Sequence, residues 1–483
     1  MDATTPVTKA RLDRLLRSVV KVMTISDAPD YDQPWQTSGT SSAFGSGAII
    51  ETRAGLRVVT NAHCVENQVF VEVRRYGKTR KYVAEVEALG HECDLALLRV
   101  QDPSFFSGTQ PMRLGGVPEL SERVSVCGYP VGGDRLSITE GIVSRVEVVQ
   151  YAQSQRRLLA LQVDAAINNG NSGGPVLYDG ELVGLAFQTL EDAEQIGYIV
   201  AAPVISHFLT DVAEGIIDGF PALGIAVQAL EAEAHRRQLG LPAEVEGGVL
   251  VTRIAYGGSA WGILEEEDVL LELDGVPLAA DGTVSFRDDE QVSYDYLVAQ
   301  RRVGELLNAR VWRDGGVLTC VVPLRAPAYL VAEDRYDVRP SYYVFGGLVF
   351  VPLTKDYLKT WGEAWWQRAP RDLVALYEHG APTPERSEPV VLQKVLADAV
   401  NQGYHELESV LITSAQGEPV RSLRHLVERI EDTADTEPFV RLTSQDGRRI
   451  VLERAAAGAR GPEILRRFGV PHDRSLDLRA TNR

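Results

Sequence analysis

The chain of 483 residues is poor in several features that mark particular classes of protein. Its four cysteines, Cys64, Cys93, Cys127 and Cys320, form no Cys-x-x-Cys pair and no zinc-like spacing, so neither a disulfide framework nor a structural metal centre organises the fold. No glycine-rich phosphate-binding loop is present, which argues against ATP-driven chemistry. Lys and Arg are outnumbered by Asp and Glu, 49 to 67, and the net charge of −18 disfavours nucleic-acid partners.

Long apolar runs are also missing. No stretch is long enough to span a bilayer, and the first residues are too polar for the hydrophobic region of a secretory signal. The sequence therefore predicts no membrane contact and a cytoplasmic location, or the nucleus in a eukaryote. Hydrophobic residues still make up 45% of the chain, which suffices for packed cores, and the length suggests about two to four domains.

The most informative stretch is Asp164 to Pro175, which reads Asp-Ala-Ala-Ile-Asn-Asn-Gly-Asn-Ser-Gly-Gly-Pro. Glycines flanking Ser172 allow a turn that exposes its hydroxyl, because they adopt backbone conformations in which a Cβ would clash. The backbone N–H groups of Gly170 and Ser172 could then stabilise the oxyanion of an acyl-transfer intermediate. Alone, the stretch is also compatible with a glycine-rich turn and an incidental serine.

Two upstream stretches favour the catalytic interpretation. The apolar run from Val58 ends at His63, and Asp94 opens the apolar run Leu-Ala-Leu-Leu-Arg-Val. Taken singly, His63 could be a core histidine and Asp94 a turn residue. Together with Ser172 they follow the His, Asp, Ser chain order of chymotrypsin-like enzymes rather than that of subtilisin or the α/β-hydrolases.

On these motifs the chain resembles the Deg/HtrA family of serine proteases with PDZ domains, over nearly its whole length. More narrowly, it resembles the branch known from plant nuclei and nucleoli, through Gln33-Pro34-Trp35, Gly128-Tyr129-Pro130 and Ser341-Tyr342-Tyr343-Val344-Phe345. The resemblance implies an ATP-independent endopeptidase that needs no cofactor or metal. It also implies a homotrimer or a multiple of trimers.

The order of short strands and turn signals predicts a mainly β chain. After an N-terminal segment (residues 1–17), residues 18–219 are expected to form a chymotrypsin-like double β-barrel protease domain with the three residues in the cleft between its barrels. Two PDZ-like α+β domains are expected to follow, the first over residues 220–327. The second, over residues 328–483, carries a helical insertion and a C-terminal tail.

The start of the first PDZ-like unit, Leu223-Gly224-Ile225, resembles a carboxylate-binding loop, and residues 294–301 resemble the groove helix. Such a groove binds a peptide by adding it as a strand to a sheet edge. A closed, purely structural β-sandwich is the alternative. A similar loop and strand begin at Phe345 in the second unit.

The resemblance assigns roles to the candidate residues. Ser172 would attack a peptide carbonyl, His63 would transfer the proton and Asp94 would orient the imidazole. Ile167 would line the specificity pocket opposite Tyr198 and Ile199, which predicts cleavage after Val, Ile, Ala or Leu. The loop 168–170 would become ordered together with loops 150–156 and 188–195 on activation.

We therefore expect a protein quality-control protease that hydrolyses unfolded or damaged polypeptides and binds peptides at its PDZ grooves. A non-proteolytic PDZ scaffold or chaperone is the alternative, and a protease with one dedicated substrate is a third hypothesis. Cys64 is expected to be a small buried thiol, with a Cys64–Cys93 bridge as the alternative.

Overall fold

The computed structural model describes residues 14–130, 135–168, 170–189, 197–432 and 437–479. They form two compact units, of which the first contains the described residues up to Asp27 and Thr40–Pro327. The second contains Ala28–Gly39 and the described residues from Ala328 onward. The predicted N-terminal segment lies outside the described residues except for 14–17.

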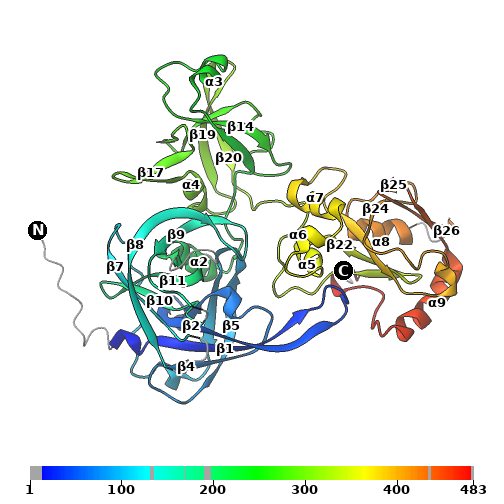
Figure 1. Cartoon of the computed structure of the whole chain (residues 1–483), viewed down its shortest axis with the longest axis horizontal. Coiled ribbons are helices and arrows are strands. Elements are labelled where there is room, and N and C mark those ends of the chain that lie inside the picture. Colours follow the sequence, from blue (N-terminus) through cyan, green and yellow to red (C-terminus); the bar gives the residue numbers. More distant parts are fainter. Residues whose placement is uncertain (1–13, 131–134, 169, 190–196, 433–436, 480–483) are drawn as a thin grey trace, which may run out of the picture. The chain divides into compact units, whose positions relative to one another are not determined.

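The first unit begins with a closed six-stranded barrel whose strands follow the order β1-β2-β3-β6-β5-β4 (Figure 1). Valine and isoleucine alternate into its interior, where Val20, Val22 and Ile49 are fully buried. Phe105, from a short 3₁₀ turn at Pro103–Phe106, also packs into this core. The strands are β1 (Val19–Pro29), β2 (Thr37–Thr52), β3 (Gly55–Thr60), β4 (Gln68–Arg75), β5 (Tyr82–Gly90) and β6 (Leu95–Val100).

A second closed barrel follows with the order β10-β11-β12-β9-β8-β7. Its strands are β7 (Arg123–Gly128), β8 (Ser137–Gln150), β9 (Arg157–Val163), β10 (Pro175–Tyr178), β11 (Glu181–Thr189) and β12 (Gly197–Ala201). Helix α2 (Ala202–Glu214) comes next and packs on β11 and β12. The helix begins with Pro203 in its first turn, and Gly215 ends it in a left-handed conformation. The predicted mainly β double barrel is confirmed.

The rest of the first unit is an α+β sandwich built on a sheet with the order β13-β14-β15-β19-β20. These strands are β13 (Ile225–Ala229), β14 (Val249–Ile254), β15 (Val269–Leu273), β19 (Leu306–Arg313) and β20 (Gly316–Pro323), and the two-residue β16 (Val276–Pro277) pairs with β15. A hairpin of β17 (Thr283–Arg287) and β18 (Glu290–Ser293) leads into the predicted groove helix, α4 (Asp295–Ala299). Helix α3 (Glu233–Gln238) connects β13 to β14.

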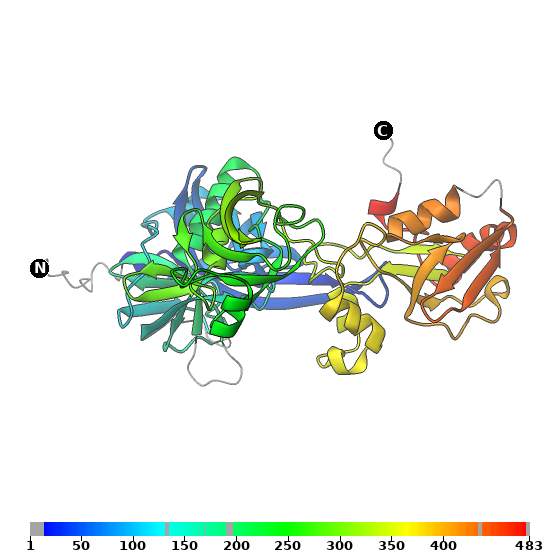
Figure 2. The same ribbon diagram turned by 90° about the horizontal axis from the view of Figure 1, so that it is seen from above.

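The second unit has a sheet with the order β21-β22-β23-β24-β26-β27, and α8 (Leu423–Glu431) lies across one face of it (Figure 2). Its strands are β21 (Tyr343–Phe345), β22 (Leu348–Pro352), β23 (Val390–Val395), β24 (Val410–Ala415), β26 (Phe439–Ser444) and β27 (Arg449–Glu453), with β25 (Glu418–Pro419) paired to β24. Three short helices, α5 (Lys355–Lys359), α6 (Trp365–Arg368) and α7 (Arg371–His379), form the insertion between β22 and β23. Helix α9 (Arg454–Arg467) follows the last strand.

Residues 28–39, which sequence reasoning placed within the protease domain, pack into this second unit. The buried Gln393 amide donates hydrogen bonds to the carbonyls of Tyr31, at 2.9 Å, and Asp32, at 3.0 Å. The Trp35 ring meets the Tyr342 ring edge-on, with 5.7 Å between centroids. These contacts join residues more than 300 positions apart, so the local sequence carries no sign of them.

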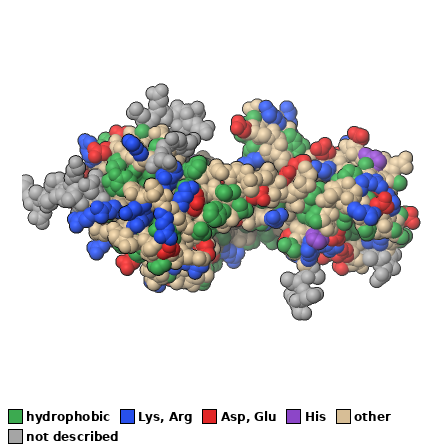
Figure 3. Space-filling view, turned by 90° about the horizontal axis from the view of Figure 1, so that it is seen from below, with side chains coloured by type: hydrophobic (Ala, Val, Ile, Leu, Met, Phe, Trp, Pro, Cys, Tyr) green, Lys and Arg blue, Asp and Glu red, His purple; other side chains and the backbone are tan. Residues whose placement is uncertain are grey.

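The surface carries charges of both signs. Lys and Arg side chains lie among Asp and Glu side chains on the face shown in Figure 3.

All four cysteines are free thiols. Cys64 is buried, as predicted, and the alternative Cys64–Cys93 bridge is not formed. None of the described helices is long and apolar enough to cross a membrane.

Candidate active site

Ser172 lies on a tight turn just before β10, where neighbouring backbone leaves no room for side chains at the following glycines. A Cβ on Gly173, whose φ is +78°, would lie 2.2 Å from the carbonyl oxygen of Ser46. A Cβ on Gly174 would lie 2.2 Å from the carbonyl oxygen of Cys127. The turn is held by hydrogen bonds from the Gly173 N–H to Ala186, at 2.8 Å, and from the Gly174 N–H to Asn171, at 2.8 Å. The two glycines are therefore required for this turn, as the sequence predicted.

Ser46, on β2 of the first barrel, fastens this turn across the cleft. Its N–H donates to the Ser172 carbonyl at 2.8 Å, and its hydroxyl donates to the Gly170 carbonyl at 2.8 Å. The same hydroxyl accepts the N–H of Tyr129 at 2.8 Å. Sequence reasoning missed this residue, although the Gly45-Ser46-Gly47 triplet at the start of an apolar strand is a signal that could have drawn attention to it.

His63 and Asp94 come from two 3₁₀ turns at the end of the first barrel, Ala62–Cys64 and His91–Cys93. The His63 Nδ1 atom lies 2.7 Å from the Asp94 Oδ2 atom, and the His63 backbone N–H donates to Asp94 Oδ1 at 3.0 Å. Asp94 is buried in a left-handed conformation, with φ of 53°, and the Asn61 amide donates to its carbonyl at 2.8 Å. The carboxylate is thus fixed by the His63 ring and backbone, and the Asp94 backbone by Asn61.

The electrostatics of this pair favour a charged imidazole. Burial alone would lower the pKa of His63, but the charge of the Asp94 carboxylate and its hydrogen bond outweigh burial and raise the pKa well above its usual value. Because the ring keeps 24% of its side-chain surface exposed, it can still meet a ligand. The pair is therefore suited to accept a proton and to hold the resulting positive charge.

The structure brings the Ser172 turn next to the His63 turn. The Cys64 thiol, directly after the histidine, lies 3.6 Å from the Ser172 carbonyl. Among the described residues, the His63 ring is hydrogen-bonded to Asp94 and not to the Ser172 hydroxyl. Such a bond often tightens only when substrate is bound.

The predicted oxyanion and pocket residues come from the connection between β9 and β10 and from β12. Gly170 has a φ of 97°, which favours glycine, while its neighbour 169 and loop residues 190–195 lie outside the described residues. Ile167 is 7% exposed and packs so closely on Gly197 that a Cβ there would lie 2.4 Å from it. The Tyr198 hydroxyl donates to Glu147 at 3.2 Å, and Ile199 has no exposed surface. Their roles in substrate selection remain predictions.

The two sheets differ at the edge where a PDZ groove would accept a peptide. In the first, β13 is an edge strand, and its preceding loop is anchored by the Ala255 N–H, which donates to the Gly224 carbonyl at 2.7 Å, and by the Ala260 N–H, which donates to the Leu223 carbonyl at 3.0 Å. In the second, the matching edge of β22 is already paired with β21. A peptide could therefore pair with β13 beside Ile225 in the first sheet. In the second sheet, β21 of the same chain already occupies the equivalent position beside β22.

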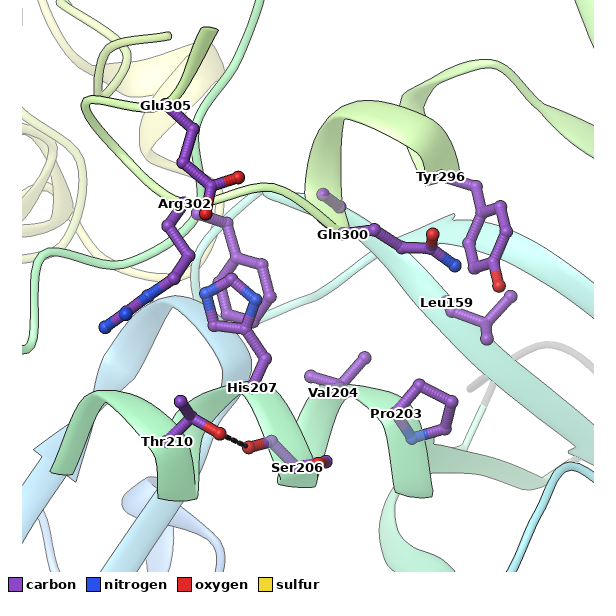
Figure 4. A pocket seen from close by; sticks show the side chains of 12 residues that line it. Leu159, Pro203, Val204, Ser206, His207, Thr210, Tyr296, Gln300, Arg302 and Glu305 are labelled. Carbon is purple, nitrogen blue, oxygen red and sulfur yellow. Dashed lines mark hydrogen bonds between the residues drawn. The ribbon is translucent and has the colours of Figure 1, made fainter. Parts of the chain in front are cut away.

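A pocket of about 380 Å³ separates α2 from α4 in the first unit (Figure 4). At its rim, the Arg302 guanidinium donates to the buried Asp211 carboxylate at 2.7 and 3.0 Å. The His207 ring, stacked on Phe220 with 4.2 Å between centroids, lies 3.5 Å from the same carboxylate. This network fastens the α+β sandwich to the second barrel.

The part of the chain that the structure describes holds no group of three or more His, Cys, Asp or Glu side chains arranged to bind a metal ion. The chemistry argued for this site uses only the hydroxyl, imidazole and carboxylate groups described above.

Two family models match the chain. The model described as a trypsin-like peptidase domain matches residues 45–185, and the model described as a PDZ domain matches residues 331–477. The first match contains His63, Asp94 and Ser172.

Curated relatives match nearly the whole chain. The putative protease Do-like 3, mitochondrial, of Arabidopsis thaliana is 36% identical over 99% of this chain and 83% of its own length. The protease Do-like 2, chloroplastic, of the same plant is 38% identical over 96% of this chain and 75% of its own length. The names of these relatives state mitochondrial and chloroplastic locations, so they do not support the narrower resemblance to a nuclear branch.

Among solved structures, the HtrA-type protease AlgW with tripeptide matches with a TM-score of 0.51 and 24% identity. The match covers 66% of this chain and 97% of that one. At this identity the likeness shows a shared fold.

Proposed function

The chain belongs to the Deg/HtrA family of serine proteases, and from that premise we propose that it cleaves unfolded or damaged proteins, without ATP, through Ser172, His63 and Asp94. The observation that carries the proposal is the His63–Asp94 hydrogen bond of 2.7 Å beside a glycine-framed serine turn. The His63–Asp94 pair belongs to the first barrel and the serine turn precedes β10 of the second, where Ser46 of the first barrel donates hydrogen bonds to the Ser172 and Gly170 carbonyls.

In this mechanism the Ser172 hydroxyl attacks the scissile carbonyl while His63 Nε2 takes its proton. Asp94 holds Nδ1 protonated, so the free nitrogen faces the serine, and its charge stabilises the imidazolium. The N–H groups of Gly170 and Ser172 stabilise the oxyanion, and each such donor lowers the barrier by about 3 kcal/mol. The protonated His63 then delivers its proton to the leaving amine, and a water molecule repeats the sequence to release the acyl product.

We further propose that Ile167, Tyr198 and Ile199 select small to medium aliphatic residues before the cleaved bond. A peptide docks beside β13, at Leu223, Gly224 and Ile225, because this strand has a free edge. The family resemblance supports a homotrimer or a multiple of trimers. The names of the relatives in the comparison support an organelle, and the cytoplasmic location predicted from the sequence stays untested.

The test combines active-site labelling with substrate digestion. A fluorophosphonate probe should label the wild-type chain at Ser172, and the wild type should degrade casein. The Ser172→Ala variant should lose both activities, while the matched Ser285→Ala variant, altered at an exposed serine on β17, should keep them. Labelling that survives in Ser172→Ala, or a wild type that neither labels nor digests casein, would contradict the proposal.

A further inference from the structure

The turn that presents Asp94 carries a second carboxylate that the proposed mechanism does not use. Glu92 is the middle residue of the 3₁₀ turn His91–Cys93. Its carboxylate accepts the backbone N–H of Phe220 at 2.8 Å, across 128 positions of sequence. Its own carbonyl accepts the Ser154 hydroxyl at 2.7 Å. Glu92 therefore joins the Asp94 turn to the 150–156 loop and to the segment that enters the α+β sandwich.

Arg156 holds the same segment from the other side. Its guanidinium donates to the carbonyl of Phe220, with which it forms a short contact, and to the carbonyl of Pro221 at 3.1 Å. Its Nε atom lies 3.4 Å from the Glu92 carboxylate, and its side chain is only 9% exposed. The peptide groups at 220 and 221 are thus bound by a buried guanidinium while Glu92 binds the N–H of Phe220.

The Glu92 carboxylate also lies close to the glycine that precedes Phe220. A Cβ on Gly219, whose φ is +77°, would lie 2.4 Å from a Glu92 carboxylate oxygen. The left-handed backbone at position 219 favours glycine, and this segment passes directly against the Glu92 carboxylate, whose side chain is 34% exposed.

We propose that Glu92 is a positioning residue for Asp94, which couples the placement of the first PDZ-like sandwich to the His63–Asp94 pair. The inference rests on the proposed function, because it assigns Glu92 a part in keeping that pair in catalytic geometry. Residues 219–221 lead directly into the sandwich. If the sandwich shifts against the barrels, the Phe220 N–H that the Glu92 carboxylate binds therefore shifts with it.

The conformation of the Asp94 turn explains why such support matters. Asp94 adopts a left-handed conformation with φ of 53°, which is uncommon for a residue with a Cβ, although aspartate tolerates it better than most. Asn61 fixes the carbonyl of Asp94, and Glu92 fixes the turn two residues earlier. Catalytic groups tolerate only about 0.5 Å of displacement, so loosening one of these contacts reaches the His63 ring.

The experiment uses the full-length chain with three variants of Glu92. Glu92→Gln keeps an amide oxygen that can accept the Phe220 N–H, whereas Glu92→Ala removes the acceptor and Glu92→Asp shortens it out of reach. We expect Glu92→Ala and Glu92→Asp to lower kcat for casein-derived peptides about 10-fold, with KM little changed, and Glu92→Gln to recover most of kcat. The acid limb of the pH–rate profile should move to lower pH in the first two, because Asp94 then raises the pKa of His63 less.

Glu87→Gln is the matched control, since Glu87 lies on β5 and pairs with Arg57 at 2.7 Å, away from the Asp94 turn. If Glu92→Ala does not fold, the comparison of Glu92→Asp with Glu92→Gln decides alone. Wild-type kcat and an unmoved acid limb in Glu92→Asp would overturn the inference, as would a change confined to KM. The proposed function fails separately, if the wild-type chain shows no labelling that depends on Ser172.

Discussion

Replacing Asp94 by Asn tests the centre of the proposed mechanism with almost no change in shape. In the structure, the Asp94 Oδ1 atom accepts the backbone N–H of His63 at 3.0 Å, and Oδ2 faces Nδ1 at 2.7 Å. The asparagine oxygen must occupy the Oδ1 position, because only an acceptor suits a backbone N–H. Its NH₂ group then faces Nδ1, and the proton of the ring moves to Nε2.

With that tautomer, His63 cannot accept the proton of Ser172. The same exchange of tautomer in a Ser-His-Asp enzyme lowers kcat about 10⁴-fold. At about 1.4 kcal/mol for each factor of ten, the loss corresponds to about 5 kcal/mol of transition-state stabilisation. The variant also removes the charge that raises the pKa of His63. In the wild type, activity should fall as pH drops through that raised pKa, because the protonated ring is no base, and in the variant this acid limb should lie at lower pH.

The assay is the second-order rate of fluorophosphonate labelling at Ser172, measured from pH 5 to 9 with casein digestion alongside. Asp102→Asn is the control, because the side chain of Asp102 is 41% exposed and pairs with Arg80 on the surface. We expect that control to match the wild type. Retention of more than about a tenth of the labelling rate by Asp94→Asn, or an acid limb that does not move, would refute the assignment of Asp94.

Two further predictions concern stability. Arg302→Ala should destabilise the first unit by about 3 kcal/mol in chemical denaturation, because it leaves the Asp211 carboxylate, 3% exposed, without its guanidinium. Arg310 pairs with Glu272 and is 45% exposed, so Arg310→Ala should lower the free energy of unfolding by less than about 1 kcal/mol. Equal effects of the two substitutions would contradict the reasoning. In the second unit, burial raises the pKa of Asp356 from 3.8 to about 6, helped by the nearby Asp334 carboxylate. Folding therefore favours its protonated form, so the wild type should lose stability relative to Asp356→Asn as pH rises from about 4 to about 6, and a constant difference would disprove this.

The sequence predicted those parts of the molecule that depend on local pattern. Short apolar runs between turn signals predicted the barrel strands, and the motifs around His63 and Asp94 predicted a pair that the structure brings to 2.7 Å. The glycines around Ser172 predicted its turn, because the backbone conformations of such a turn are accessible to glycine and strained for other residues.

What the sequence did not predict depends on partners far away along the chain. Ser46 binds the carbonyl of Gly170 across 124 positions, and its role follows only from the approach of the two barrels. The ends of helix α2 are set by Pro203 and Gly215 rather than by its apolar pattern. The pairing of β21 with β22 was also missed, since Tyr343 looks like any apolar strand residue until its neighbours are known.

The segment 28–39 has a practical consequence for anyone who shortens this protein. A chain cut after Pro327 would keep Tyr31, Pro34 and Trp35 but discard the surface that shelters them. Without that surface the buried Pro34 and the packed rings of Tyr31 and Trp35 would be exposed together, and an exposed apolar patch of this kind promotes association. Truncated versions should therefore replace this tip with a short polar turn if they are to stay monodisperse.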